Sequence, residues 1–147
     1  MPRYWEVHAA LLTLGTAFVV MGYLSLWLKS IGKLESLGVS VPLGKRLARF
    51  WYKWHVALGI VGVAMVLGGI GWGYLMVQWA YGGPHLRLSH SWVGAVTGFA
   101  VSGPVLLGYL TRHVKKGKRS VRWWHMILGF AGLAMLFIGL STGFGLD

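Results

Sequence analysis

The chain of 147 residues has no cysteine and only three acidic residues. Without cysteine it can form no disulfide, no cysteine-ligated zinc site and no thiolate-held iron–sulfur cluster. Charged residues make up 12% of the sequence, against about 25% in soluble domains. What the sequence has instead is a hydrophobic share of 56% and 14 basic residues, which give a formal charge of +11. Because the basic residues fall between long apolar stretches, the composition favours a membrane protein over a nucleic-acid-binding one.

Four apolar stretches are long enough to cross a bilayer, which takes about 20 residues. They run approximately over residues 7–28, 52–79, 89–110 and 121–142. The first is too long for the apolar part of a signal peptide and lacks a clean cleavage site, so we expect it to be a helix of the protein. The predicted fold is a single all-α membrane domain over residues 1–147, an up-and-down bundle of four transmembrane helices.

The basic residues predict the orientation of this bundle. Twelve of the 14 lie in or beside the connections 29–51 and 111–120, and only Arg3 and Arg87 lie on the other side. Since cytoplasmic connections of membrane proteins are rich in lysine and arginine, both basic connections are predicted to be cytoplasmic and both termini to lie outside. Tryptophan and tyrosine cluster at the ends of the apolar stretches, which is typical of the membrane interface.

A histidine lies near the start of each apolar stretch, and ionisable residues inside membrane helices usually mark a functional site. These residues are His8, His55, His90 and His125. A glycine follows seven residues after the first and four residues after the others, at Gly15, Gly59, Gly94 and Gly129. Residues at these spacings share a helix face with the histidine. Each helix is therefore predicted to present an imidazole beside a bare groove that could take a flat cofactor.

Helix direction predicts which histidines meet. The first and third helices start outside, so His8 and His90 lie at an outer level, whereas His55 and His125 lie at an inner level. In a four-helix bundle these helix pairs are the diagonals, so each level offers two imidazoles across the bundle axis. At about 1.5 Å per residue, the two levels are on the order of 20 Å apart in depth.

Two imidazoles with glycine-lined space between them suit a b-type haem with two axial histidines. Two such haems would pass single electrons across the membrane. Zinc is less suitable, because it takes four ligands and each level has two histidines without cysteine or a nearby buried acid. Copper stays open, although it does not explain the glycines. The histidines could also be core residues bonded to neighbouring helices, or relays of a non-redox transporter.

Residues 84–94, Pro-His-Leu-Arg-Leu-Ser-His-Ser-Trp-Val-Gly, resemble the Pro-x-Leu-Tyr-Ser-Leu-His-Ser-Trp-Leu-Gly stretch of the ascorbate-type cytochrome b561 family. The segment that starts at His125, His-Met-Ile-Leu-Gly, is similar to the His-x-x-Leu-Gly segment of the next helix in that family. The family usually has six helices, whereas this chain has the four-helix core, and Arg87 stands where many members have tyrosine.

This resemblance implies a transmembrane oxidoreductase with two haem b groups, each iron held by two histidines. The ligand pairs would be His8 with His90 and His55 with His125. The resemblance also implies a homodimer that moves electrons from cytoplasmic ascorbate to monodehydroascorbate or a ferric chelate outside. Another function stays open: a haem-bearing membrane anchor subunit of a redox complex that is reduced by quinol.

Charged side chains near each level are candidate contacts for haem propionates or for an anionic reductant. On the inner side these candidates are Arg49, Lys53, Lys118 and Arg122. On the outer side they are His85 and Arg87. The inner residues are also explained by the orientation of the protein alone, because cytoplasmic connections are basic whether or not they bind an anion.

Overall fold

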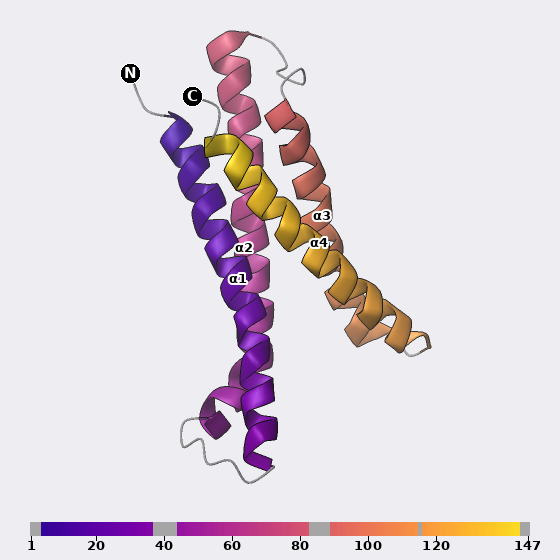
Figure 1. Ribbon diagram of the computed structural model, residues 1–147. Helices are drawn as coiled ribbons and strands as arrows, with labels where there is room; N and C mark the ends of the chain where they lie inside the picture. Colours follow the sequence, from indigo (N-terminus) through magenta and orange to yellow (C-terminus); the bar gives the residue numbers. More distant parts are fainter. Residues whose placement is uncertain (1–3, 37–43, 83–88, 115, 145–147) are drawn as a thin grey trace.

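The computed structural model describes residues 4–36, 44–82, 89–114 and 116–144. This part contains four helices (Figure 1), namely α1 (Tyr4–Ser36), α2 (Gly44–Tyr81), α3 (Ser89–His113) and α4 (Lys118–Phe144). Helices satisfy their own backbone hydrogen bonds, which a chain needs wherever water is absent. Gly82 has a φ of 66°, and its N–H donates to the Gln78 carbonyl at 3.1 Å. A left-handed glycine therefore ends α2.

Each helix contains a stretch that is long and apolar enough to cross a membrane. These stretches are Trp5–Leu26, Phe50–Trp79, His90–His113 and Lys118–Gly143. The prediction of an all-α protein with four membrane-length helices is confirmed, and every predicted boundary lies within three residues of the observed one. Figure 1 shows that α1 begins and α4 ends at the end of the bundle where α2 ends and α3 begins.

The predicted polar connection over residues 29–51 lies between the first two membrane-length stretches, and most of it is itself helical. Helix α1 continues to Ser36 and α2 already begins at Gly44, so both helices extend past their apolar stretches. Lysine, arginine, leucine and glutamate have high helix propensity, so a helix need not end where the chain becomes polar. Hydropathy marks where a helix leaves the apolar layer and does not mark where the helix itself ends.

The four helices form two hairpins. Helix α1 packs along α2 and α3 along α4, while the hairpins touch each other through fewer contacts, between α2 and α3 and between α1 and α4. Figure 1 shows the α3–α4 hairpin inclined to the α1–α2 hairpin, with the two diverging at the lower end. A contact between α1 and α3, or between α2 and α4, therefore also connects the two hairpins.

The buried core is small and takes one side chain from each helix: Val19, Val66, Val101 and Leu136. Each of these residues stands eleven positions after the histidine of its own helix. Eleven residues complete about three turns, so each core residue lies on the same helix face as its histidine. The core therefore lies in the middle of the bundle, between the two levels at which the histidines are found.

Most other large apolar side chains point outward. Phe99 of α3 is 83% exposed and Phe130 of α4 is 64% exposed, as expected for surfaces that face lipid. Aromatic side chains near the helix ends are exposed as well: Trp5, Trp54, Trp79, Trp92, Tyr109, Trp123 and Trp124. The positions predicted for an interfacial aromatic belt are thus free to contact lipid.

Candidate functional site

The structure brings the four histidines together in two pairs, one at each end of the buried core. The ring centroids of His8 in α1 and His90 in α3 lie 6.2 Å apart, with the ring planes at 83°. Those of His55 in α2 and His125 in α4 lie 6.0 Å apart, at 86°. Both pairs join one hairpin to the other. The predicted pairing across the diagonals of the bundle is therefore present in the fold.

All four histidines are also held by a hydrogen bond at the same ring atom, Nδ1. In His8 this nitrogen donates to the Gly69 carbonyl at 2.7 Å, and in His55 it donates to the Gly22 carbonyl at 3.0 Å. These two bonds run in opposite directions between α1 and α2. In the other hairpin, Nδ1 of His125 donates to the Pro104 carbonyl at 2.8 Å.

His90 differs from the other three histidines in the kind of group that accepts its bond. Its Nδ1 lies 3.3 Å from the hydroxyl oxygen of Thr142, and this hydroxyl donates its own proton to the Gly139 carbonyl at 3.1 Å. Since that proton is used, the Thr142 oxygen is left as the acceptor for His90. With the hydroxyl in this orientation, His90 has the same protonation pattern as the other three rings.

A carbonyl oxygen can only accept, so the Nδ1 that faces it must carry the ring proton. In a neutral imidazole the other nitrogen, Nε2, then keeps a free lone pair. Metal-ligating histidines in proteins are usually oriented in this way, with the second ring nitrogen donating to a carbonyl or carboxylate. The fold therefore holds His8, His55 and His125 in the tautomer that leaves Nε2 free to bind a metal, and the bond from Thr142 to Gly139 favours the same tautomer for His90.

A repeat that runs through all four helices explains these bonds. The residues fourteen positions after the histidines are Gly22, Gly69, Pro104 and Gly139. Three of their carbonyls accept directly from the histidine of the antiparallel neighbour, and the fourth is reached through Thr142. In α2, α3 and α4 the residue eighteen positions on is glycine: Gly73, Gly108 and Gly143.

These last glycines make room for the imidazole rings. A Cβ added to Gly73 would lie 2.6 Å from Nδ1 of His8. One added to Gly108 would lie 3.2 Å from Cε1 of His125, and one added to Gly143 would lie 3.1 Å from Cε1 of His90. The carbonyl thus accepts the hydrogen bond of the imidazole from the facing helix, directly or through a hydroxyl, and the glycine leaves space for its ring. Sequence reasoning missed these residues, although the shared spacings of fourteen and eighteen were a signal for them.

The same bonds measure the distance between the two levels. His55 is bonded to Gly22, which lies fourteen residues after His8 in α1. At about 1.5 Å of rise per residue, the two histidine pairs are about 20 Å apart along the helix. Pro104 and His90 give the same separation in α3, because His125 is bonded to Pro104. The depth expected from the sequence agrees with this value.

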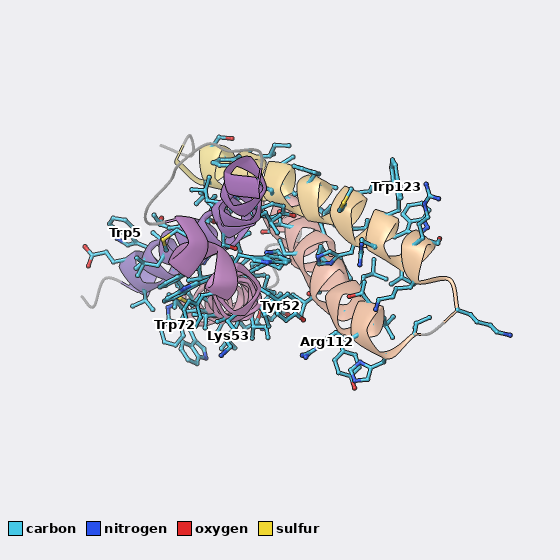
Figure 2. All side chains as sticks on the ribbon, turned by 90° about the horizontal axis from the view of Figure 1, so that it is seen from below. Trp5, Tyr52, Lys53, Trp72, Arg112 and Trp123 are labelled. Carbon is cyan, nitrogen blue, oxygen red and sulfur yellow. The ribbon has the colours of Figure 1, made fainter. Side chains whose placement is uncertain are left out.

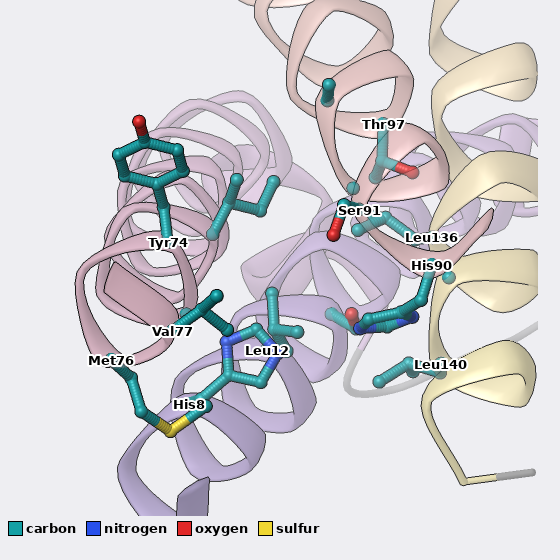
Figure 3. A pocket seen from close by; sticks show the side chains of 16 residues that line it. His8, Leu12, Tyr74, Met76, Val77, His90, Ser91, Thr97, Leu136 and Leu140 are labelled. Atoms are coloured by element: carbon teal, nitrogen blue, oxygen red, sulfur yellow. The ribbon is translucent and has the colours of Figure 1, made fainter. Parts of the chain in front are cut away.

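An apolar cavity of about 270 Å³ lies at the His8–His90 pair, which the sequence predicts to be the outer one (Figure 3). His8 and His90 meet in it, and its walls include Leu12, Val77 and Leu140. Two threonines line the wall nearer the core. The hydroxyl of Thr97 donates to the Val93 carbonyl at 2.7 Å, whereas the buried hydroxyl of Thr16 has no partner among the described residues. The cavity can therefore take a largely apolar group, and Thr16 offers it one free hydroxyl.

The four predicted glycines have different surroundings. A Cβ at Gly59 or at Gly94 would meet nothing within 4 Å, and Gly94 lines the outer cavity. These two agree with a bare groove beside the histidine. Gly15 does not: its Cβ would lie 2.9 Å from the Gly62 carbonyl and from the backbone nitrogen of Val66. Gly15 instead lets α1 and α2 pack backbone to backbone.

The space beside Gly129 is also filled by a packed side chain. The hydroxyl of Tyr23 in α1 occupies the space where its side chain would begin, and the Tyr23 ring packs on Phe130 with centroids 5.8 Å apart. The expectation that Gly129 leaves room for a cofactor is therefore corrected. Its missing side chain accommodates a tyrosine that links α1 to α4.

The charged candidates are placed less closely to the histidines. Nζ of Lys53 lies 5.8 Å from the Phe50 ring, and Lys53 is two residues from His55, a spacing that puts the two on different faces of α2. Lys118 and Arg122 are exposed on α4, and Arg122 is on the same helix face as His125. Arg49 lies in α2 but its side chain is outside the described part. His85 and Arg87 lie outside the described residues.

A cation–π contact joins the two hairpins at the end of the bundle that holds His55 and His125, the predicted inner end. The guanidinium of Arg112 in α3 lies 5.6 Å from the centroid of the Tyr52 ring in α2. Figure 2, seen from below, shows Tyr52 and Arg112 with Lys53 at this end of the bundle. Such a cation–π contact is worth about 0.5–1 kcal/mol at an exposed site. Arg112 therefore links α3 to α2 at this end, whereas Lys53 lies near Phe50 of its own helix.

His113 gives a contrast to the four paired histidines. It is exposed at the end of α3, stacks on Tyr109 with centroids 4.2 Å apart, and its Nδ1 donates to the Tyr109 carbonyl of its own helix. No group of three or more His, Cys, Asp or Glu side chains able to hold a metal occurs among the residues that the structure describes. A metal at either pair would therefore take two ligands from this part of the chain.

The fold and the site together define a four-helix membrane protein with two inter-hairpin histidine pairs. No family model, curated protein or solved structure matches the chain.

Proposed function

We propose that this protein is a transmembrane electron-transfer protein with two bis-histidine b haems, similar to the four-helix core of the ascorbate-type cytochromes b561. His8 and His90 would hold the outer haem, and His55 and His125 the inner one. The observation that carries the proposal is the shared tautomer: in both pairs Nδ1 is the donor, so Nε2 is left for a metal.

The distance between the rings supports this reading. Bonds between an imidazole nitrogen and a transition metal are about 2 Å long, so two imidazoles on opposite sides of one metal have centroids about 6 Å apart. The observed separations are 6.2 and 6.0 Å. Two imidazoles without a metal can also pack edge to face at this distance. The Nδ1 bonds of both pairs, and the apolar cavity at the His8–His90 pair, favour the metal-bound reading, because edge-to-face packing needs neither of them.

When bound, each haem would supply a carrier of single electrons, held by the two histidines of its pair. The residues of the chain orient the ligands through the carbonyls of Gly22, Gly69 and Pro104 and the hydroxyl of Thr142. The apolar wall of the outer cavity would limit the access of water to the haem there. The core between the levels keeps them at a fixed separation. Such a site suits outer-sphere electron transfer and leaves no open position for a substrate.

The proposed direction of transfer follows from the basic inner end. Both basic connections would lie in the cytoplasm and both termini outside. Ascorbate would then reduce the inner haem, and monodehydroascorbate or a ferric chelate would oxidise the outer one. The protein would act as an oxidoreductase and, by the same resemblance, as a homodimer. If quinol reduces it instead, together with a co-purifying partner, the protein is an anchor subunit of a larger complex.

The test is the reduced-minus-oxidised absorption spectrum of the purified protein together with a haem count. Two low-spin b haems per chain are expected. His90→Ala should lose the outer haem alone and His125→Ala the inner haem alone, because each pair holds its own cofactor. The matched control is His113→Ala, which removes an exposed histidine of the same membrane domain and should retain both. A colourless wild-type protein, expressed with sufficient haem, would overturn the proposal.

A further inference from the structure

Two hydroxyl side chains occupy the same place in the fourfold repeat, next to one histidine at each level. Ser25 stands seventeen residues after His8, and Thr142 stands seventeen residues after His125. The corresponding positions in α2 and α3 are Trp72 and Leu107, which carry no hydroxyl. Each hydroxyl donates to the carbonyl three residues earlier in its own helix, Gly22 for Ser25 and Gly139 for Thr142. These are the carbonyls that the repeat assigns to His55 and His90.

The two hydroxyls modify the histidine bond in different ways. Ser25 is buried, and its hydroxyl shares the Gly22 carbonyl with His55, at 2.6 Å against 3.0 Å for the histidine. Thr142 is inserted into the bond, so that His90 reaches a hydroxyl at 3.3 Å where the other histidines reach a carbonyl. The histidines without such a neighbour, His8 and His125, have the shortest bonds, at 2.7 and 2.8 Å.

We propose that Ser25 and Thr142 are positioning residues that set the reduction potentials of the two sites, one residue for each level. The proposal rests on the proposed function. A stronger bond from Nδ1–H raises the basicity of a ligating imidazole, which favours the ferric state and lowers the potential. Ser25 competes with His55 for the Gly22 carbonyl and thereby weakens the hydrogen bond from His55. The Thr142 hydroxyl oxygen is the acceptor for the hydrogen bond from Nδ1 of His90.

Removing the two hydroxyls should therefore shift the potentials in opposite directions. Ser25→Ala frees the Gly22 carbonyl for His55 and should lower the inner potential. Thr142→Val keeps the volume but removes the hydroxyl that Nδ1 of His90 contacts. Because His90 makes no direct bond to the Gly139 carbonyl, this variant should raise the outer potential. We expect a two- to fivefold change in the reduction equilibrium for each, which corresponds to about 20–40 mV at 59 mV per tenfold for one electron.

The experiment is a spectroelectrochemical titration of the purified holoprotein, with each haem assigned in the His90→Ala or His125→Ala background. Ser102→Ala and Ser141→Ala are matched controls, because these serines also donate to carbonyls of their own helices, Gly98 at 2.7 Å and Ile138 at 2.9 Å, and neither carbonyl accepts from a histidine. Both controls should leave the potentials unchanged. Thr142→Ser and Ser25→Thr retain the hydroxyls and should stay close to the wild type.

Two failures are distinguishable. If the wild-type protein binds no haem, the proposed function fails. If the haems are bound and either potential stays unchanged, or moves opposite to the stated direction, the roles of Ser25 and Thr142 are refuted. A purely structural role would instead lower haem occupancy without these opposite shifts, and the spectrum recorded before each titration measures that occupancy.

Discussion

The tight backbone packing of α1 against α2 predicts a large cost for a side chain at Gly15. A Cβ there would lie 2.9 Å from the Gly62 carbonyl oxygen, the Val66 nitrogen and Val66 Cγ2. Two of these three atoms are backbone and cannot rotate away. Gly15→Val therefore forces the helices apart, which strains the His8–Gly69 and His55–Gly22 bonds that cross the same interface.

The magnitude follows from a comparison with Gly68→Val. Gly68 is in α2, and its Cβ would meet nothing within 4 Å, so this variant carries the same change in helix propensity without the collision. Overpacking a tight interface typically costs about 1–3 kcal/mol. We take about 2 kcal/mol as the expected difference in the free energy of unfolding, or roughly 4–8 °C in Tm for a chain of this size.

The assay is thermal unfolding of both variants in the same detergent, combined with the spectrum of each level. Because α1 carries His8, the proposed outer ligand, and accepts the bond of His55, the proposed inner one, Gly15→Val should weaken haem retention at both levels. Equal Tm values for Gly15→Val and Gly68→Val would refute the packing argument. Loss of the outer haem alone, with unchanged stability, would instead support the role beside the cofactor that the sequence predicts for Gly15.

Two other predictions test the cavity and the orientation. Gly94→Leu fills the outer cavity at a position where a Cβ meets nothing within 4 Å, so the variant should fold normally and lose the outer haem alone. The control is Gly71→Leu, a position that is also open but outside the cavity lining, and this variant should keep both haems. Retention of the outer haem by Gly94→Leu would contradict the proposed site. Because the chain has no cysteine, Lys116→Cys and Trp5→Cys give thiol labels without background. In intact cells an impermeant reagent should label position 5 and spare position 116, and the reverse pattern would invert the predicted topology.

The apolar stretches determine the four helices. The spacing along each helix determines which residues lie on the same helix face as the histidine. His8, His55, His90 and His125 could be placed at two levels from helix direction alone. Their pairing followed because a bundle of four antiparallel helices has only two diagonals. The eleven-residue spacing to Val19, Val66, Val101 and Leu136 was also present in the sequence, where it marks the shared core face.

The tertiary structure decided what each of these faces touches. Gly15 and Gly94 both follow a histidine on its own helix face, yet Gly15 meets the backbone of α2 and Gly94 borders a cavity. The acceptors at Gly22, Gly69, Pro104 and Thr142 belong to the neighbouring helix, and which carbonyl faces which ring depends on the register between two antiparallel helices. Periodicity along one helix is local and can be read from a single chain. Register between helices is set by backbone contact, as at Gly15 and Gly62, and appears only when both helices are in place.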